Sequence, residues 1–417
     1  MKKLSIPVVP HVLRNKQFIK LWLSQLLTIT GLNIVNFVLL LQLFNKTNST
    51  LAASFLWIAY SIPILLVGPF ASTVADIVNR KKLLVITTLL QSLTILLFLF
   101  TGDRYFLLYT ILFVYSLISQ FYLPSESATL PALVTKEELP EANGLFLLTK
   151  QAGMLIGFGS AGFLSKYLGF HPTLILCSIL LAIACISVAS LPKMSHQRRL
   201  DIETDLTQFF SKVLDGYRYI KNNKQILYPI LLVAGGEIIM YIIAINIPAL
   251  VKELLNIAVE DAALYIIIPA LVGAMLGVYI FPKILRKQIR KILIIRTAIL
   301  GLALCFLAIG VFLPLVPLEI RPFLLPIICF MTGISFVGVQ IPSQTLMQEV
   351  TPPDMMGRLW GNLWFLMTIA TIIPMFLSAS ITEVLGAHTF FALLGGIISM
   401  VYLMTLSKIH IDHLPKQ

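Results

Sequence analysis

Long apolar segments constrain this chain more than any other feature of its sequence. Twelve stretches approach or exceed the length of about 20 residues that a membrane-spanning helix needs. They are residues 17–44, 51–75, 82–101, 104–133, 142–166, 170–191, 225–251, 261–284, 290–313, 321–347, 358–384 and 386–407. Runs this long are unlike the short alternating strands of a membrane barrel, and a helix satisfies its own backbone hydrogen bonds in lipid. The sequence therefore predicts an all-α polytopic membrane protein with twelve transmembrane helices.

The composition indicates that lipid is the main solvent of the chain. It is 58% hydrophobic and 12% charged, with a mean hydropathy of +0.91, whereas soluble domains carry about 25% charged residues. The net charge of +12 would suit nucleic acid, but the basic residues stand in short runs between apolar segments, as membrane topology requires. All four cysteines lie inside apolar runs without metal-type spacing. No nucleic-acid partner, metal or cofactor is therefore expected.

A long polar stretch divides the apolar segments into six and six. We expect residues 1–191 to form an N-terminal six-helix bundle, residues 192–224 a cytoplasmic linker, and residues 225–417 a C-terminal six-helix bundle with a short tail. Within the linker, apolar residues recur at helical spacing over residues 206–220. This pattern indicates an amphipathic helix at the membrane surface.

The basic residues predict the orientation. With the N-terminus inside, the inward segments hold 25 of the 31 Lys and Arg residues and the outward loops hold five. The positive-inside rule then places both termini and the linker in the cytoplasm, in a multi-pass protein of the plasma membrane. The basic N-terminal arm has no apolar core or cleavage site, so the first span is expected to be its own targeting element.

A charged turn after the second span is a candidate gate. Asp76 and Arg80 are four residues apart, and between them Asn79 can tolerate a left-handed backbone. Arg358, which opens the eleventh span, is the expected partner or an interface anchor. The alternative is a plain charged turn without a gating role.

The fifth segment carries a ladder of glycines at Gly144, Gly153, Gly157 and Gly162. Gly153 and Gly157 form a GxxxG pair, which lets two helices approach closely in lipid. We expect these glycines to be helix-packing positions, which suits transport in either direction.

Glu237, Glu126 and Lys150 are the ionisable candidates inside predicted spans. Glu237 is about halfway along the seventh span, where a charge costs several kcal/mol unless it is paired or protonated. It is a candidate proton carrier; the alternative is a carboxyl hydrogen-bonded within the bundle. Glu126 and Lys150 are each twelve positions from Glu138, at the turn between the fourth and fifth spans. An antiparallel hairpin would place them at similar depth, as an ion pair with a role in coupling, in substrate binding or in structure alone.

Uncharged amides form two stripes. Gln25, Asn33 and Asn36 fall within about 80° of one another on the first span, at roughly 100° per residue. Gln340, Gln344 and Gln348 follow i, i+4, i+8 on the tenth span. Such amides hydrogen-bond varied ligands or hold helices together, and both interpretations stay open.

Several functions lack their motifs. The chain has no phosphate-cradling loop with a lysine, no nucleophile with a matched base, no His/Glu zinc pair on a helix, and no repeated selectivity filter. An ATP motor, an enzyme and a channel are therefore not expected.

Several motifs carry a resemblance to one family. PSESATLPALVTKEELPEANG from Pro124 and PSQTLMQEVTPPDMMGRLWG from Pro342 are echoes half a chain apart, which indicates two similar halves. The loop at Asp76 resembles the inter-helix loop motif of the major facilitator superfamily. The glycine ladder resembles the antiporter motif of its exporters, with Phe158 where that motif has Pro. The whole chain resembles this superfamily, and within it the drug:proton antiporter-3 group, which includes macrolide efflux and enterobactin exporters.

The resemblance implies alternating access by two six-helix halves around a central cavity. It implies a proton-coupled exporter of an amphipathic or lipophilic small molecule (drug, macrolide or siderophore), which works in membrane lipid as a monomer. Spans 1, 4, 7 and 10 would line the cavity. A lysophospholipid flippase on the same scaffold is the nearest alternative, and a membrane sensor that transports nothing is a further one.

Overall fold

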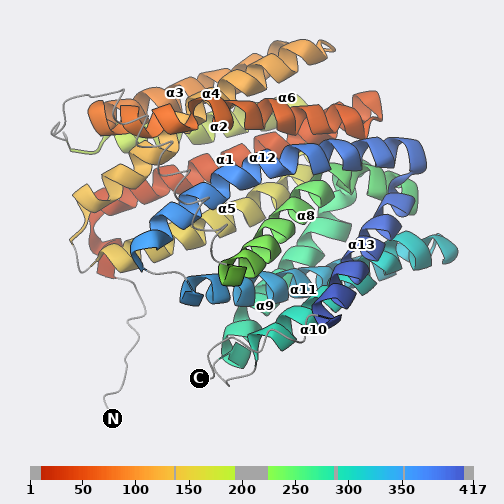
Figure 1. The fold of residues 1–417 in the computed structure, drawn as a ribbon. Coiled ribbons are helices and arrows are strands. Elements are labelled where there is room, and N and C mark those ends of the chain that lie inside the picture. The colour runs from red at the N-terminus through yellow and green to blue at the C-terminus, as the bar shows by residue number, and fades with distance from the viewer. Residues whose placement is uncertain (1–10, 136–137, 193–223, 286–289, 351–352, 408–417) are drawn as a thin grey trace. The chain divides into compact units, whose positions relative to one another are not determined.

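The computed structural model of the protein describes residues 11–135, 138–192, 224–285, 290–350 and 353–407. Within them the regular structure is helical throughout (Figure 1). Among the described residues, eleven helices are long and apolar enough to cross a membrane. The twelfth long helix, α5, has 29 residues, and several of its side chains lie outside the described set. The all-α fold predicted from the sequence is confirmed, and the predicted linker helix at 206–220 lies outside the described residues.

The long helices follow the predicted segments closely. They are α1 (Lys16–Thr47), α2 (Thr50–Ile77), α3 (Arg80–Leu97), α4 (Tyr105–Leu133), α5 (Leu139–Tyr167), α6 (Phe170–Ala189), α8 (Lys224–Leu255), α9 (Ile268–Leu285), α10 (Lys291–Leu307), α11 (Arg321–Val350), α12 (Pro353–Leu385) and α13 (Ala387–Ser407). Short 3-10 or π segments are η1 (His11–Arg14), η2 (Phe98–Phe100), η3 (Val259–Asp261), η4 (Ala263–Ile267), η5 (Ala308–Phe312) and η6 (Leu313–Leu315). The long helices form because lipid leaves no other way to satisfy the backbone of these apolar runs.

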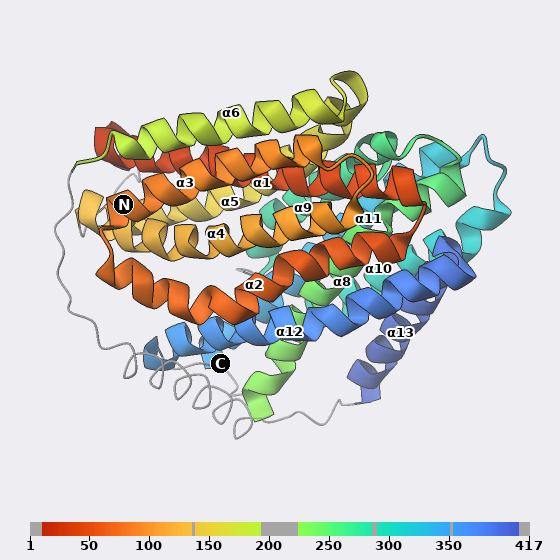
Figure 2. The ribbon, with the colours of Figure 1, turned by 90° about the horizontal axis from the view of Figure 1, so that it is seen from above.

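The chain divides into two compact units. Unit 1 comprises Met1–Leu43 and Phe55–Phe210, and unit 2 comprises Phe44–Ser54 and Ser211–Gln417. In unit 1, α3 packs against both α4 and α6 (Figure 2). In unit 2, α10 packs against both α11 and α13. The third helix of each set of six therefore contacts the fourth and the sixth, which is the arrangement expected of a structural repeat.

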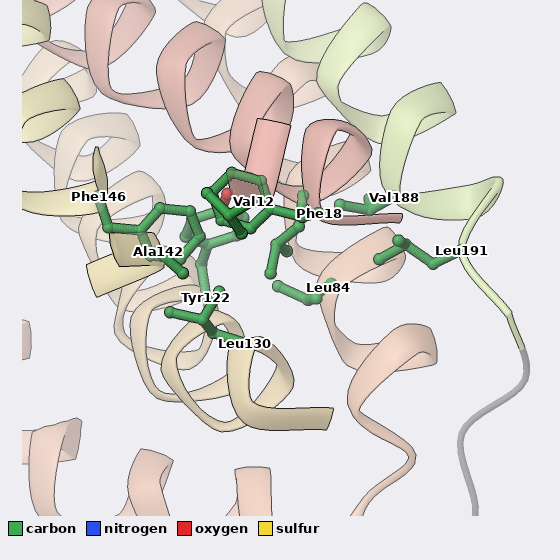
Figure 3. Close-up of a cluster of buried hydrophobic side chains, with 10 residues drawn as sticks. Val12, Phe18, Leu84, Tyr122, Leu130, Ala142, Phe146, Val188 and Leu191 are labelled. Atoms are coloured by element: carbon green, nitrogen blue, oxygen red, sulfur yellow. The ribbon is translucent and has the colours of Figure 1, made fainter. Parts of the chain in front are cut away.

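A cluster of buried apolar side chains holds several helices of unit 1 together (Figure 3). Its members come from η1, α1, α3, α4, α5 and α6, and one, Leu191, lies just after α6. They are Val12, Phe18, Leu21, Leu84, Tyr122, Leu130, Ala142, Phe146, Val188 and Leu191. The rings of Phe18 and Phe146 stack with centroids 5.8 Å apart. The cluster thus connects α1 to α5, two helices that are far apart in sequence.

Cations at the start of the third helix hold each unit together. In unit 1, Arg80 donates to the Ala128 carbonyl oxygen (2.9 Å) and Lys81 donates to the Leu191 carbonyl oxygen (2.5 Å). These two bonds tie α3 to α4 and to the end of α6. A cation on a carbonyl near a helix C-terminus also complements the helix dipole.

The same arrangement recurs in unit 2. Lys291 forms an ion pair with Glu349 of α11 (2.5 Å), and Arg296 donates to the Thr405 carbonyl oxygen of α13 (2.5 Å). The basic residues that the positive-inside rule explains therefore also fasten helix ends.

Two turns repeat as well. Asn48 precedes α2 and Asn256 precedes the second helix of unit 2, and both have positive φ, 50° and 53°. Gly169 immediately precedes α6 with φ 86°, and Gly386 immediately precedes α13 with φ 87°. A glycine suits these positions because it adopts a left-handed backbone without a Cβ clash. Asn79, which can tolerate such a backbone, does not adopt it: it has φ −56° and caps α3, its side chain accepting from the Lys82 amide (3.1 Å).

The contact between α9 and α11 is close, because glycines of each helix face backbone of the other there. A Cβ on Gly333 would overlap the Ala270 carbonyl oxygen, and one on Gly273 would overlap the Phe330 carbonyl oxygen. Backbone atoms cannot rotate away as a side chain can, so this contact tolerates no added atom without a helix shift.

We predict that Gly333→Ala lowers the stability of the protein by about 1–3 kcal/mol, the usual cost of overpacking. Gly396→Ala on α13 is the matched control, because a Cβ there meets nothing within 4 Å among the described residues. The control should keep or slightly raise stability, since alanine is the better helix former. Thermal unfolding in detergent measures both, and equal melting temperatures for the two variants would contradict the prediction.

Candidate functional site

The most buried carboxyl among the site candidates is Glu126, on α4. It is 2% exposed, and the Tyr122 hydroxyl, one helical turn earlier and 5% exposed, donates to its Oε1 (2.9 Å). The Tyr122 oxygen also lies 3.3 Å from the hydroxyl of Ser24 on α1, which is fully buried. A buried polar group is costly unless it is hydrogen-bonded, and this chain of three side chains provides that bonding.

Lys150 lies on α5 close to the same place. Its ammonium acts electrostatically on the Glu126 carboxyl, although its side chain is itself exposed. The preceding residue, Thr149, accepts a hydrogen bond from the Trp22 indole of α1 (2.6 Å). The structure therefore brings Glu126 and Lys150 together at the meeting of α1, α4 and α5, and a direct ion pair between them stays a prediction.

The amides of α1 differ from one another. Gln25 and Asn36 are 5% and 4% exposed, and the side-chain carbonyl oxygen of each has no hydrogen-bond partner among the described residues. Asn33 is half-buried and donates to the Ile29 carbonyl oxygen of its own helix (2.8 Å). Gln25 and Asn36 therefore each have an acceptor oxygen that no described residue engages, while the Asn33 amide already donates within α1.

The three amides predicted to form a stripe on α11 become more exposed along the helix. Gln340 is 6% exposed, Gln344 is half-buried and Gln348 is exposed. The Gln340 amide donates weakly to the Val233 carbonyl oxygen of α8 (3.4 Å), and its own oxygen has no partner among the described residues. Gly236 of α8 allows this approach, since a Cβ there would lie 2.5 Å from Gln340 Nε2. Of the three amides on α11, Gln340 is therefore the one that resembles Gln25 and Asn36 in being buried with an unpartnered oxygen among the described residues.

Glu237 follows Gly236 on α8 and is half-buried. Its carboxyl acts electrostatically on Tyr241, one helical turn later on the same helix. The structure therefore places Glu237 next to the close contact between α8 and α11.

Of the three gating candidates, the structure describes the side chain of Arg80 only. Asp76 belongs to the last turn of α2 and Arg358 to the first turns of α12, but neither side chain is described. Arg80 is described, and its bond to Ala128 ties α3 to α4. A gate between these residues stays a prediction.

The predicted packing glycines do not behave alike. A Cβ on Gly153 would lie 2.7 Å from the Ile29 side chain, and one on Gly157 would overlap Asn33. Both glycines therefore face α1 at close range. A Cβ on Gly144 would meet nothing within 4 Å among the described residues, and Gly162 is buried.

Tyr122 and Ser24 were not identified from the sequence. Tyr122 could have been, because it is four residues before Glu126 and shares a helix face with it. Ser24 is 98 residues from Tyr122, and only the packing of α1 on α4 brings them together. Among the described residues no group of three His, Cys, Asp or Glu could hold a metal ion.

Comparison with known proteins identifies the class. The model of the Major Facilitator Superfamily matches residues 21–374. Over most of its length the chain therefore belongs to this superfamily, and it is a multi-pass membrane transporter.

The individual relatives share low sequence identity with the chain. The chain is 23% identical over 371 residues to the uncharacterized MFS-type transporter YfiS of Bacillus subtilis, covering 88% of this chain and 87% of that protein. It is 23% identical over 399 residues to macrolide efflux protein A of Streptococcus pyogenes, covering 92% and 93%. The solved nucleoside transporter NupG has the same fold, with a TM-score of 0.69 at 14% identity, covering 94% of this chain and 98% of that one.

We predict that Glu126 and Lys150 are energetically coupled. Lys150→Met alone should destabilise the protein more than the double variant Glu126→Gln/Lys150→Met does, because the single change leaves a buried carboxylate without its counter-charge. A double-mutant cycle measured by thermal unfolding tests this. Effects of the two single variants that simply add would show that the two groups do not interact.

Proposed function

We propose that the protein is a secondary active transporter that exports an amphipathic or lipophilic small molecule by alternating access, driven by the proton gradient. The observation that carries this proposal is a pair of buried amide oxygens on α1 in unit 1, those of Gln25 and Asn36, which lack partners among the described residues. An unmade hydrogen bond of this kind costs about 1–3 kcal/mol. A ligand with a large apolar body and a few donor groups would remove that cost, which is the usual chemistry of a small-molecule site.

The relatives support export. One is a macrolide efflux protein and another, 25% identical over 275 residues, is multidrug resistance protein 2 of Bacillus subtilis. Drug, macrolide and siderophore substrates all combine an apolar body with a small number of polar groups. A lysophospholipid shares that chemistry, so flipping of a lipid is an outcome that the experiment below must separate.

The driving force would come from protonation of membrane-embedded carboxyls. We assign the proton-carrying role to Glu237, with Glu126 and Lys150 as the coupling pair. A carboxyl at this depth is costly when charged and unpaired, so its protonation state can favour one conformation over another. The cytoplasmic side would be closed by a gate of Asp76, Arg80 and Arg358. Both termini would lie on that side, and the protein would act as a monomer in the plasma membrane.

We predict that a macrolide or a lipophilic cation stabilises the purified protein against heat. A ligand that binds the native state at a hundredfold excess over its dissociation constant adds about 2.7 kcal/mol. Erythromycin, tetraphenylphosphonium, a catechol siderophore, a lysophospholipid and uridine form the panel, with uridine as the comparison for the nucleoside transporter fold. A shift with lysophospholipid alone, above the detergent background, would replace export with flipping. No shift with any compound would contradict the proposed site.

We predict that Glu237→Gln abolishes the pH dependence of flux in proteoliposomes that carry an imposed pH gradient. The amide has nearly the shape of the carboxyl but cannot exchange a proton. Tyr241→Phe is the control on the same helix, and it should keep the gradient dependence. Uptake by Glu237→Gln that matches the parent protein at every pH would remove Glu237 from the mechanism.

A further inference from the structure

Three buried side chains form a continuous hydrogen-bonded chain from α4 to α1 inside unit 1. Glu126 accepts from Tyr122, and the Tyr122 oxygen contacts the Ser24 hydroxyl. All three are at most 5% exposed. Tyr122 is also a member of the apolar cluster in Figure 3, so the hydrogen bonds of this chain are made with other buried side chains.

The direction of these hydrogen bonds depends on the charge of Glu126. A carboxylate only accepts, and a tyrosine has one proton to donate. While Glu126 is ionised, Tyr122 donates to it, and the remaining contact requires Ser24 to donate to the Tyr122 oxygen. When Glu126 binds a proton it gains a donor of its own. It can then donate to Tyr122, and Tyr122 can donate to Ser24, with no bond in the chain lost.

We propose that Tyr122 and Ser24 are positioning residues that transmit the protonation of Glu126 to helix α1. This rests on the proposed proton coupling at Glu126. In the protonated state the Ser24 proton is released from the chain. The Thr28 hydroxyl lies one helical turn further along α1 and is 4% exposed. It makes no hydrogen bond of ordinary geometry with a described residue, but it is close enough to the Tyr122 hydroxyl to act on it. It is the acceptor that this reversal would engage.

The change in hydrogen bonding would reach α1, the helix that carries the candidate ligand acceptors Gln25 and Asn36. Gln25 follows Ser24 directly, and Asn36 lies on nearly the same face of α1 three turns later. A proton on α4 would in this way change the hydrogen bonds available on α1, without any contact between the proton and the ligand.

Charged side chains on three further helices have described contacts near the elements that carry Glu126 and its partners. Lys150 acts on it from α5, and the Arg80 guanidinium of α3 is bound two residues along α4, at Ala128. Lys20 of α1 donates to the Ser190 carbonyl oxygen at the end of α6 (2.8 Å). Glu141 of α5 is a second carboxyl in this region and accepts from the Val12 amide (3.1 Å), so a pH effect is assigned to Glu126 only where Glu126→Gln abolishes it.

The chain contains a natural reporter of α1. Trp22 is two residues before Ser24, and its indole donates to Thr149 of α5. Its fluorescence therefore depends on local packing and hydrogen bonding at this point of α1. The other tryptophans, Trp57, Trp360 and Trp364, can be replaced by phenylalanine to leave this signal alone.

The experiment is a pH titration of Trp22 fluorescence in the purified full-length protein, without substrate and without a gradient. The emission should change with pH in the reporter protein. The change should be lost in Glu126→Gln, which cannot titrate, and in Tyr122→Phe, which breaks the chain in its middle. Tyr115→Phe on the same helix is the matched control, since Tyr115 is fully buried and its hydroxyl has no partner among the described residues. It should retain the full change.

Each other outcome overturns the proposal. A full change in Tyr122→Phe would show that the proton acts on α1 by another route, and a full change in Glu126→Gln would show that another group titrates. A flat titration of the reporter protein itself would show that α1 does not respond. If Tyr122→Phe does not remain monodisperse, Ser24→Ala breaks the chain at its other end. Because no flux is measured, a protein that exports no macrolide can still pass or fail this test.

Discussion

The close approach of helices is the constraint on which the rest of this structure depends. In lipid there is no hydrophobic force between helices, so dispersion contacts and a few hydrogen bonds must hold them. Gly333 and Gly273 let α9 and α11 meet backbone to backbone, and Gly153 and Gly157 let α5 meet α1. Each of these contacts fixes where the polar side chains of the two helices lie.

The polar contacts follow from that packing. Gly236 brings α8 against Gln340, beside Glu237. The meeting of α1 with α5 and α4 brings Ser24, Trp22 and Tyr122 toward Glu126 and Lys150. Polar groups that would be expensive in an apolar interior are thus concentrated where small residues leave room for them. A transporter needs this property, because its ligand groups must be both buried and able to change partner.

The internal repeat is expressed more strongly in geometry than in sequence. The echo between the Pro124 and Pro342 stretches is short, and the basic loop after α9 has no acidic residue to match Asp76. Yet Arg80 and Lys81 in one unit and Lys291 and Arg296 in the other fasten the third helix to the fourth and sixth. The chemistry of each clamp differs, while the helix ends it joins are the same. A fold constrains which ends must be joined and leaves open which atoms join them.

The sequence alone determined the elements. The length of the apolar runs leaves helices as the one solution in lipid, and the predicted spans agree with the observed helices to within a few residues at most ends. Helical spacing also brought out Gln25 and Asn36, because that spacing is a local property. Only the tertiary structure decided which of these groups are buried and what they meet. Gln348 repeats the spacing of Gln340 but is exposed, and Gly144 continues the glycine ladder but faces no neighbour among the described residues. Ser24 carries no local signal at all, because its partner is 98 residues away, and such a contact depends on how helices pack rather than on how any one of them forms.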